Sequence, residues 1–292
     1  MKRKTTNPLK KYNQPGPAPA PPPEVKPRTQ RKVKKRRGFK VAPERWQGSP
    51  EPQPPKVGPV GGLTRILLVC PIYELYEETL ASIYRLRWPG WIDYLFPCEN
   101  PEGDSFADIE FQYRKAQEVF LHGNYDAMFT IESDVIAPSD AMVKLAQTGM
   151  DIAYGIYACR YGGEHRGKWS AYLRTLEDGR QIHSISSEPQ QARAWWGDAH
   201  PCTGVGLGCT MIRRHVLEQI ELRCTEAHHP DTNLAREANR RGISQIAHFG
   251  VICGHIMREP RGVLWPDPSS PQMYTIVERD CKRCDAGRRQ GA

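Results

Sequence analysis

Two carboxylates stand one residue apart in the stretch DAMFTIESDVIAP, residues 126–138, directly after an apolar run. Glu132 and Asp134 could approach one divalent cation together. Hard oxygen ligands suit Mg²⁺ or Mn²⁺, which proteins typically hold with one or two carboxylates and the phosphates of a substrate. The same two residues could instead form a surface turn that leads into a helix. The pair therefore indicates a candidate metal site, and its setting must decide between these interpretations.

Polar or turn-forming residues also follow two other apolar runs. Pro71 and Tyr73 come directly after RILLVC, and Glu99 and Asn100 come directly after WIDYLFPC. Short continuous apolar runs predict buried strands of a parallel sheet. Ligands of such sheets bind beyond the carboxyl ends of the strands. The sequence therefore predicts binding residues gathered at one edge of a sheet.

The elements that must position these residues alternate between strand and helix. The predicted strands cover residues 65–70, 91–98, 126–131 and 151–158. The predicted helices, with apolar residues at helical spacing, cover residues 74–86, 104–123, 139–149 and 230–242. This alternation predicts an α/β fold, a Rossmann-like and mostly parallel sheet with helices on both faces.

The second half of the chain departs from simple alternation. Residues 169–186 read as a hairpin around Asp178-Gly179, and residues 243–256 as one strand that ends near His255. The segment GVGLG, residues 204–208, is not a dinucleotide-binding GxGxxG motif, because a cysteine follows it and it lies far from the first strand. We expect these glycines to let backbone approach a sugar or an acceptor closely.

Four segments, in this order, resemble the GT-A fold glycosyltransferases, in particular the inverting, family 2-like group. RILLVCPIYELYEETLASIYRL resembles the opening strand, turn and helix, and DAMFTIESDVIAPSDAMVKL resembles the strand with the DxD motif and the following helix. TGVGLGCTMIRRHVLEQI resembles the Gly-rich segment before a strand with paired basic residues. PDTNLAREANRRGISQIAHFGVICGHI resembles the acidic helix, the final strand and the terminal histidine. The resemblance covers about residues 63–257.

The resemblance implies a role for each acidic residue and for the histidine. Asp134 matches the last aspartate of DxD and would bind the metal, Mn²⁺ or Mg²⁺, that bridges the donor diphosphate. Glu132 stands where the family has the first aspartate, which often faces the sugar or ribose. His255 matches the histidine that can complete the metal shell, although its residue type at a strand end also suits a core position. Asp231 matches the general base, but the family often has Glu-Asp where this chain has Pro230-Asp231.

The same resemblance implies the substrates. Pro71, Tyr73, Glu99 and Asn100 would lie where the family contacts the nucleobase or ribose of a nucleotide-diphosphate sugar. The acceptor could be a glycan, a protein or a nucleic acid.

The first 62 residues differ from the rest in composition. They hold 14 of the 26 prolines and a net charge of +13, whereas the remainder has a net charge of −5. Few apolar residues predict a disordered tail, and its basic run could contact nucleic acid or another polyanion, or act as a solvated tether. The predicted domains are therefore a tail over 1–62, a GT-A-like domain over 63–265 and a C-terminal tail over 266–292. The N-terminus lacks the apolar core of a signal peptide, and a cytoplasmic protein is expected.

The cysteines indicate no structural zinc site, and two other function classes remain alternatives. Nine scattered cysteines predict reduced thiols, and Cys281 with Cys284 forms a lone CxxC that supplies only two of the four ligands of a structural zinc site. A nucleotidyltransferase of related fold remains an alternative, although its Gly-rich basic turn is absent after the first strand. A further alternative is a nucleic-acid- or polyanion-binding protein with a degenerate transferase domain. The chain could also be a transferase whose tail brings it to a nucleic acid or another polyanionic acceptor.

Overall fold

The computed structural model describes residues 59–101, 103, 105–160, 166–175, 181–204, 206–225, 229–258 and 261–279. All but the last four residues of the predicted N-terminal tail lie outside these ranges, as do Cys281 and Cys284. Within the described ranges, none of the helices has the length and apolarity that crossing a membrane requires.

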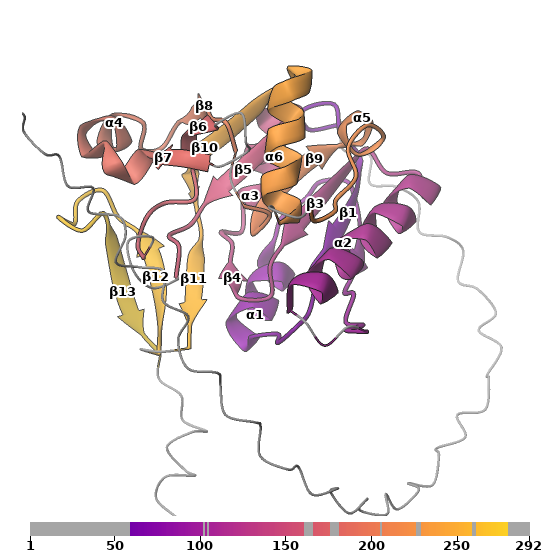
Figure 1. The fold of residues 1–292 in the computed structure, drawn as a ribbon, viewed down its shortest axis with the longest axis horizontal. Helices are drawn as coiled ribbons and strands as arrows, with labels where there is room; N and C mark the ends of the chain where they lie inside the picture. The colour runs from indigo at the N-terminus through magenta and orange to yellow at the C-terminus, as the bar shows by residue number, and fades with distance from the viewer. Residues whose placement is uncertain are drawn as a thin grey trace, which may run out of the picture. The chain divides into compact units, whose positions relative to one another are not determined.

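A mixed central sheet dominates the fold (Figure 1). In spatial order, the strands that the structure describes in it are β2 (Trp91–Leu95), β1 (Arg65–Val69), β3 (Ala127–Ile131), β9 (Cys209–Arg213), β5 (Ile152–Ile156), β10 (Gln245–Ile252) and β8 (Ala199–Pro201). β1 runs parallel to β2 and β3, and β5 runs parallel to β10, whereas β9 and β8 are antiparallel to their neighbours. The α/β fold is thus confirmed, but the sheet is mixed rather than mostly parallel, because β9 enters between β3 and β5 in the opposite direction.

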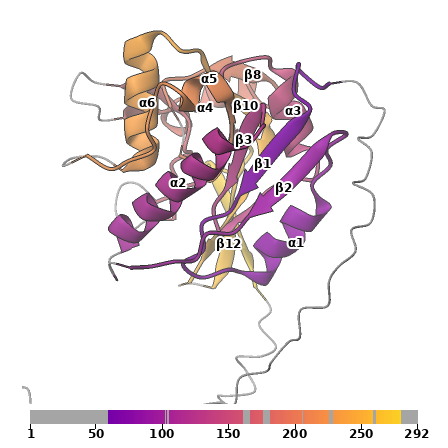
Figure 2. The ribbon, with the colours of Figure 1, turned by 90° about the vertical axis from the view of Figure 1, so that its right-hand side faces the viewer.

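Helices cover both faces of this sheet. Figures 1 and 2 show α2 (Ser105–His122) and α6 (Pro230–Arg241) on one face, and α1 (Glu77–Arg85) and α3 (Ala141–Gln147) on the other. α6 ends as predicted, with Gly242 in the left-handed conformation at φ 68°. Every residue of β3 and β5 is buried, as the continuous apolar runs predicted, because helices pack on both sides of these strands.

A second, antiparallel sheet adjoins the first. It consists of β13 (Tyr274–Glu278), β12 (Gly262–Pro266), β11 (Gly254–Met257) and β4 (Val135–Ile136). The single strand predicted over 243–256 is therefore wrong: the chain leaves the central sheet after β10 and pairs again as β11. Residues 266–292, predicted as a tail, include β13, which pairs with β12. Local hydrophobic pattern does not show where a strand changes sheets.

Several smaller elements complete the described fold. The hairpin is confirmed as β6 (Tyr172–Thr175) and β7 (Gln181–Ser184), whose turn lies outside the described residues. The remaining helices of the described ranges are the 3₁₀ helix η3 (Ile185–Ser187), α4 (Pro189–Ala194) and α5 (Arg214–Leu217).

One of the paired basic residues after β9 has a structural position. Arg214 donates hydrogen bonds to the carbonyl oxygens of Leu121, Gly123 and Tyr125 at 2.8–3.1 Å. These carbonyls belong to the end of α2 and the turn after it, where helical partners run out. Arg214 thus closes the C-terminus of α2 and supports the negative end of its dipole.

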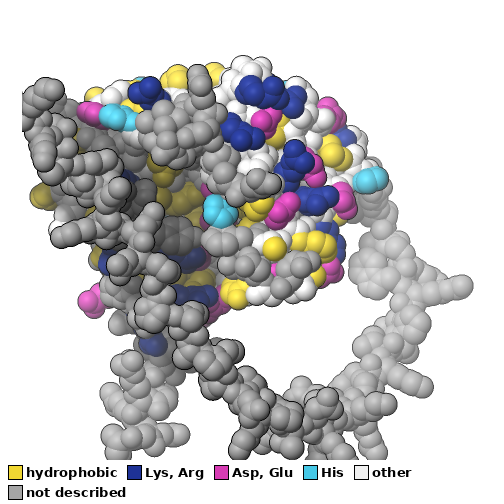
Figure 3. All heavy atoms as spheres, in the orientation of Figure 1, with side chains coloured by type: hydrophobic (Ala, Val, Ile, Leu, Met, Phe, Trp, Pro, Cys, Tyr) yellow, Lys and Arg dark blue, Asp and Glu magenta, His cyan; other side chains and the backbone are white. Residues whose placement is uncertain are grey.

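Figure 3 shows acidic and basic side chains interspersed on the described surface of this face, around α2 and α6. Such a surface suits the mildly acidic balance of the chain after its tail.

Candidate functional site

The candidate site lies where the chain passes from the central sheet to the second sheet. Two segments make this passage: β3 leads through residues 132–134 into β4, and β10 leads through Cys253 into β11. β4 and β11 pair, with His255 opposite Val135, and the amide of Ile256 donates to the carbonyl oxygen of Asp134 at 2.8 Å. The pairing brings Asp134 and His255, 121 positions apart in sequence, beside one another.

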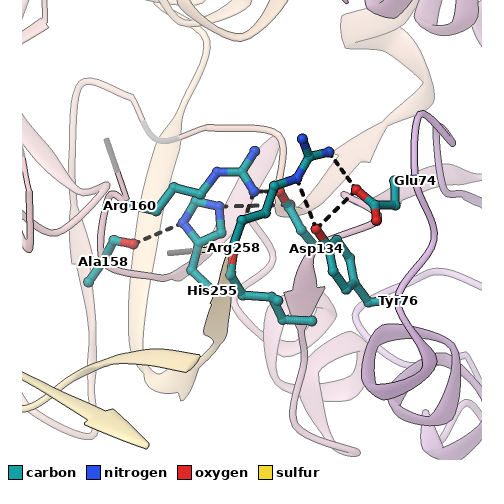
Figure 4. A network of polar contacts seen from close by, with 8 residues as sticks. Glu74, Tyr76, Asp134, Ala158, Arg160, His255 and Arg258 are labelled. Carbon is teal, nitrogen blue, oxygen red and sulfur yellow. Dashed lines mark hydrogen bonds and ion pairs between the residues drawn. The ribbon is translucent and has the colours of Figure 1, made fainter. Parts of the chain in front are cut away.

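The Asp134–His255 pair is buried, and a hydrogen bond determines which ring nitrogen of His255 faces Asp134. Only 8% of Asp134 and 4% of His255 is exposed. His255 Nδ1 lies 2.9 Å from the carbonyl oxygen of Ala158, and a carbonyl only accepts, so Nδ1 must carry the hydrogen. His255 Nε2 then faces Asp134 Oδ1 at 3.7 Å (Figure 4). A cation between these two atoms, either a proton or a metal ion, is what makes this arrangement attractive.

The other carboxylate oxygen of Asp134 is in contact with Arg160, which sequence reasoning missed. The Arg160 guanidinium forms an ion pair with Asp134 Oδ2, and its Nη1 also lies 3.4 Å from the carbonyl oxygen of Ile256. Burial alone would raise the pKa of Asp134, but the hydrogen bond and charge of His255 and the charge of Arg160 hold that pKa below its ordinary value. Asp134 is thus a carboxylate at neutral pH, with a positive group beside it.

Glu132 lies near Asp134 but differs from it in protonation state. Its amide donates to the carbonyl oxygen of Gly208 at 3.2 Å, which continues the pairing of β3 with β9. Burial, followed by the negative charges of Asp134 and Asp231, raises the pKa of Glu132 to about 8, and Arg160 only partly offsets this. Glu132 is therefore mainly protonated at pH 7 and can donate a hydrogen bond.

Asp231 lies in the first turn of α6, near enough for its charge to raise the pKa of Glu132. The amide of Thr232 donates to its Oδ1 at 2.6 Å. Burial raises the pKa of Asp231, while the hydrogen bond from Thr232 and the charge of His229 partly oppose the increase. A raised pKa makes this carboxylate a better proton acceptor.

Tyr157, a second residue that sequence reasoning missed, lies between Asp231 and His255. Its ring meets the His255 ring edge-on, with centroids 5.2 Å apart. A Cβ on Gly206 would lie 1.8 Å from the Tyr157 hydroxyl and 3.4 Å from Asp231 Oδ2. Gly206 and Gly208 thus make room for Tyr157. That the glycines of GVGLG let backbone approach a sugar or an acceptor stays a prediction.

Tyr113 on α2 adds a buried hydroxyl to this region. Within the described part of the chain, that hydroxyl has no hydrogen-bond partner. Burial raises its pKa well above the ordinary value, and the charges of Glu132 and Asp231 contribute further. Neither tyrosine could be found from sequence, since an aromatic residue in an amphipathic helix or at a strand end is typical of a core.

The residues expected to meet the nucleotide lie at the ends of β1 and β2. Pro71 is buried, whereas Tyr73, Glu99 and Asn100 are exposed. Gln112 of α2 joins the two strand ends: its side-chain nitrogen lies 3.1 Å from the carbonyl oxygen of Ile72, 3.3 Å from that of Glu99 and 2.7 Å from Asn100 Oδ1. The Glu99 carboxylate forms an ion pair with Lys115 at 2.7 Å.

The donor set suits a divalent ion only in part. Among the described residues, no group of three or more His, Cys, Asp or Glu side chains is placed to hold a metal. Asp134 and His255 supply one oxygen and one nitrogen, and the hydrogen bond from Nδ1 to Ala158 leaves Nε2 as the coordinating atom. Such a pair fits an ion whose remaining ligands are water and substrate phosphates.

Comparison with known proteins gives similarity only at the level of fold. No family model matches the sequence, and no curated protein matches it. Protein A197 from STIV is structurally similar with a TM-score of 0.48 and 18% identity, covering 75% of this chain and 96% of that one. The mannosyltransferase PcManGT from Pyrobaculum calidifontis, solved in complex with GDP-Man and Mn²⁺, has a TM-score of 0.43 and 12% identity, covering 72% of this chain and 62% of that one.

Proposed function

We propose that the chain is a metal-dependent glycosyltransferase that transfers a sugar, with inversion, from a nucleotide-diphosphate sugar to an acceptor hydroxyl. The observation that carries this proposal is the gathering of Asp134, His255, Glu132 and Asp231 at one junction between two sheets. These four residues come from three separate parts of the chain. Their types supply a metal-binding pair, a neutral hydrogen-bond donor and a basic carboxylate.

The Asp134–His255 pair is the proposed metal site. A divalent ion held there would neutralise negative charge on the departing diphosphate. Pro71, Tyr73, Glu99 and Asn100 are proposed to contact the nucleobase or ribose, because they occupy the adjoining ends of β1 and β2. Glu132, protonated at neutral pH, would donate a hydrogen bond to a hydroxyl of the sugar or ribose.

Asp231 is the proposed general base. As the acceptor oxygen forms its bond to the anomeric carbon, the bond from that carbon to the diphosphate oxygen breaks, and Asp231 receives the acceptor proton. The raised pKa of Asp231 favours this proton transfer. The hydrogen bond from Thr232 to Oδ1 orients the carboxylate and leaves Oδ2 beside Gly206.

The test uses donor turnover, which needs no knowledge of the acceptor, because water can replace it slowly. A panel of UDP- and GDP-sugars with Mn²⁺ is incubated with the wild type and with Asp134→Asn, and the released nucleotide is identified. We expect release of a nucleoside diphosphate, at least a 100-fold loss in Asp134→Asn and loss of the wild-type activity in EDTA.

The matched control is Asp140→Asn, a change of the same type at an exposed carboxylate that pairs with Lys144 at 2.9 Å. It should turn over donor as the wild type does. Full activity of Asp134→Asn in EDTA would refute the proposal, and release of pyrophosphate would indicate nucleotidyl transfer instead.

A further inference from the structure

Arg160 contacts the carboxylate that is proposed to bind the metal ion. Asp134 offers two carboxylate oxygens: Arg160 pairs with Oδ2, while His255 Nε2 faces Oδ1. A buried carboxylate requires a compensating charge, and the guanidinium supplies it here. A divalent ion at the same carboxylate would meet a fixed positive charge within a few ångströms, and this repulsion weakens metal binding.

We propose that Arg160 and the divalent ion are alternative partners of Asp134, and that Arg160, displaced by the ion, binds the donor diphosphate. This inference rests on the proposed function in assigning the metal to Asp134. It names a diphosphate-binding residue outside the four matched segments, and it makes ion entry and phosphate binding one coupled event.

The position of Arg160 permits this exchange. Only three residues separate Arg160 from the end of β5, so its backbone is anchored beside the site. Its side chain is 29% exposed, whereas that of Asp134 is 11% exposed, so the arginine is the more solvent-accessible member of the pair. The planar fork of arginine matches phosphate oxygens with two parallel hydrogen bonds.

A neighbouring arginine provides a matched comparison. Arg258 lies in the same network, but its guanidinium binds the Glu74 carboxylate at 2.5 Å and the Tyr76 hydroxyl at 3.3 Å rather than Asp134 (Figure 4). Removing Arg258 takes one positive charge from this region and leaves the Arg160–Asp134 contact in place. It therefore separates the specific contact from the general effect of charge.

The test measures binding of Mn²⁺ alone, by calorimetry, to the wild type, Arg160→Ala, Arg258→Ala and Asp134→Asn. We expect Arg160→Ala to bind Mn²⁺ at least tenfold more tightly than the wild type, Arg258→Ala to stay within threefold of it, and Asp134→Asn to lose binding. In a second titration, with Mn²⁺ saturating, methylenediphosphonate serves as a diphosphate that carries no base or sugar. Arg160→Ala should bind it at least tenfold more weakly than the wild type.

Opposite changes in the two titrations are the signature of exchange, because a merely structural arginine would weaken both or neither. Equal Mn²⁺ affinity in the wild type and Arg160→Ala overturns the inference, as does absence of Mn²⁺ binding in both, or unchanged diphosphonate affinity. Thermal unfolding of each variant reports whether it folds. Arg160→Lys keeps the charge, so its Mn²⁺ affinity should lie near that of the wild type and below that of Arg160→Ala. A failed sugar-transfer assay alongside these opposite changes would refute the proposed function alone.

Discussion

The close approach of Gly206 to Tyr157 predicts a steric coupling that can be measured without any substrate. In Gly206→Ala the new methyl carbon would lie 1.8 Å from the Tyr157 hydroxyl oxygen, but 3.1 Å from the ring carbon that bears it. Tyr157 is buried against His255 and cannot simply move away. Overpacking of this kind costs about 1–3 kcal/mol.

Removing the hydroxyl should recover most of that loss. In the double variant Gly206→Ala with Tyr157→Phe, the nearest atom is the ring carbon at 3.1 Å, a contact that a shift of a few tenths of an ångström relieves. We therefore expect a favourable coupling of about 1–2 kcal/mol between the two changes, measured from urea unfolding of the wild type, both single variants and the double variant.

Gly208 supplies the matched control for this cycle. A Cβ there would meet the Tyr157 ring itself, at 2.7 Å from Cε1 and 3.0 Å from Cζ. Tyr157→Phe leaves those atoms in place, so it should not rescue Gly208→Ala. If the Gly206 and Tyr157 effects add within about 0.5 kcal/mol, or if Tyr157→Phe rescues both glycine variants equally, the described packing is wrong.

Two further predictions concern charge. Because burial holds the pKa of Asp231 above its ordinary value, the folded state binds a proton more tightly than the unfolded state, and stability falls as pH rises through that range. Asp231→Asn should therefore lose transfer activity yet unfold at a higher temperature than the wild type at pH 7. The difference in unfolding temperature should vanish near pH 3. A lower unfolding temperature of the variant at pH 7 would contradict this prediction. Arg214→Ala removes the donor to the last carbonyls of α2 and should lower the free energy of unfolding by about 2 kcal/mol. The control is Arg240→Ala, which removes an exposed ion pair with Glu237 and should change that free energy by less than about 0.5 kcal/mol. Urea unfolding of both variants measures the difference, and equal losses would contradict the role of Arg214.

Much of the fold follows from local pattern. The apolar runs that became β1, β3 and β5 predicted buried strands, since a strand covered by helices on both sides hides such residues on both faces. The helix from Pro230 to Arg241 was predictable from its start and stop residues, with Pro230 in the first turn and Gly242 after the last. These signals act over a few residues, so a single sequence contains them.

The sequence also indicated which side chains to consider. Acidic residues at a strand end and at the start of a helix are visible as patterns, and the structure brings Glu132, Asp134, Asp231 and His255 into one region. Their roles stay proposals. The protonation of each carboxylate was not predictable, because burial and neighbouring charge determine it and both arise only on folding.

Only the tertiary structure decided what stands beside these residues. The antiparallel entry of β9, the passage of two strands into a second sheet and the contact of Arg160 with Asp134 all depend on pairings between segments far apart in the chain. An arginine after a strand looks the same in sequence whether it faces water or a buried carboxylate. Residue types and local spacing thus determined the strands, the helices and the candidate acids. Long-range pairing of strands placed Arg160, Tyr157 and His255 around those acids.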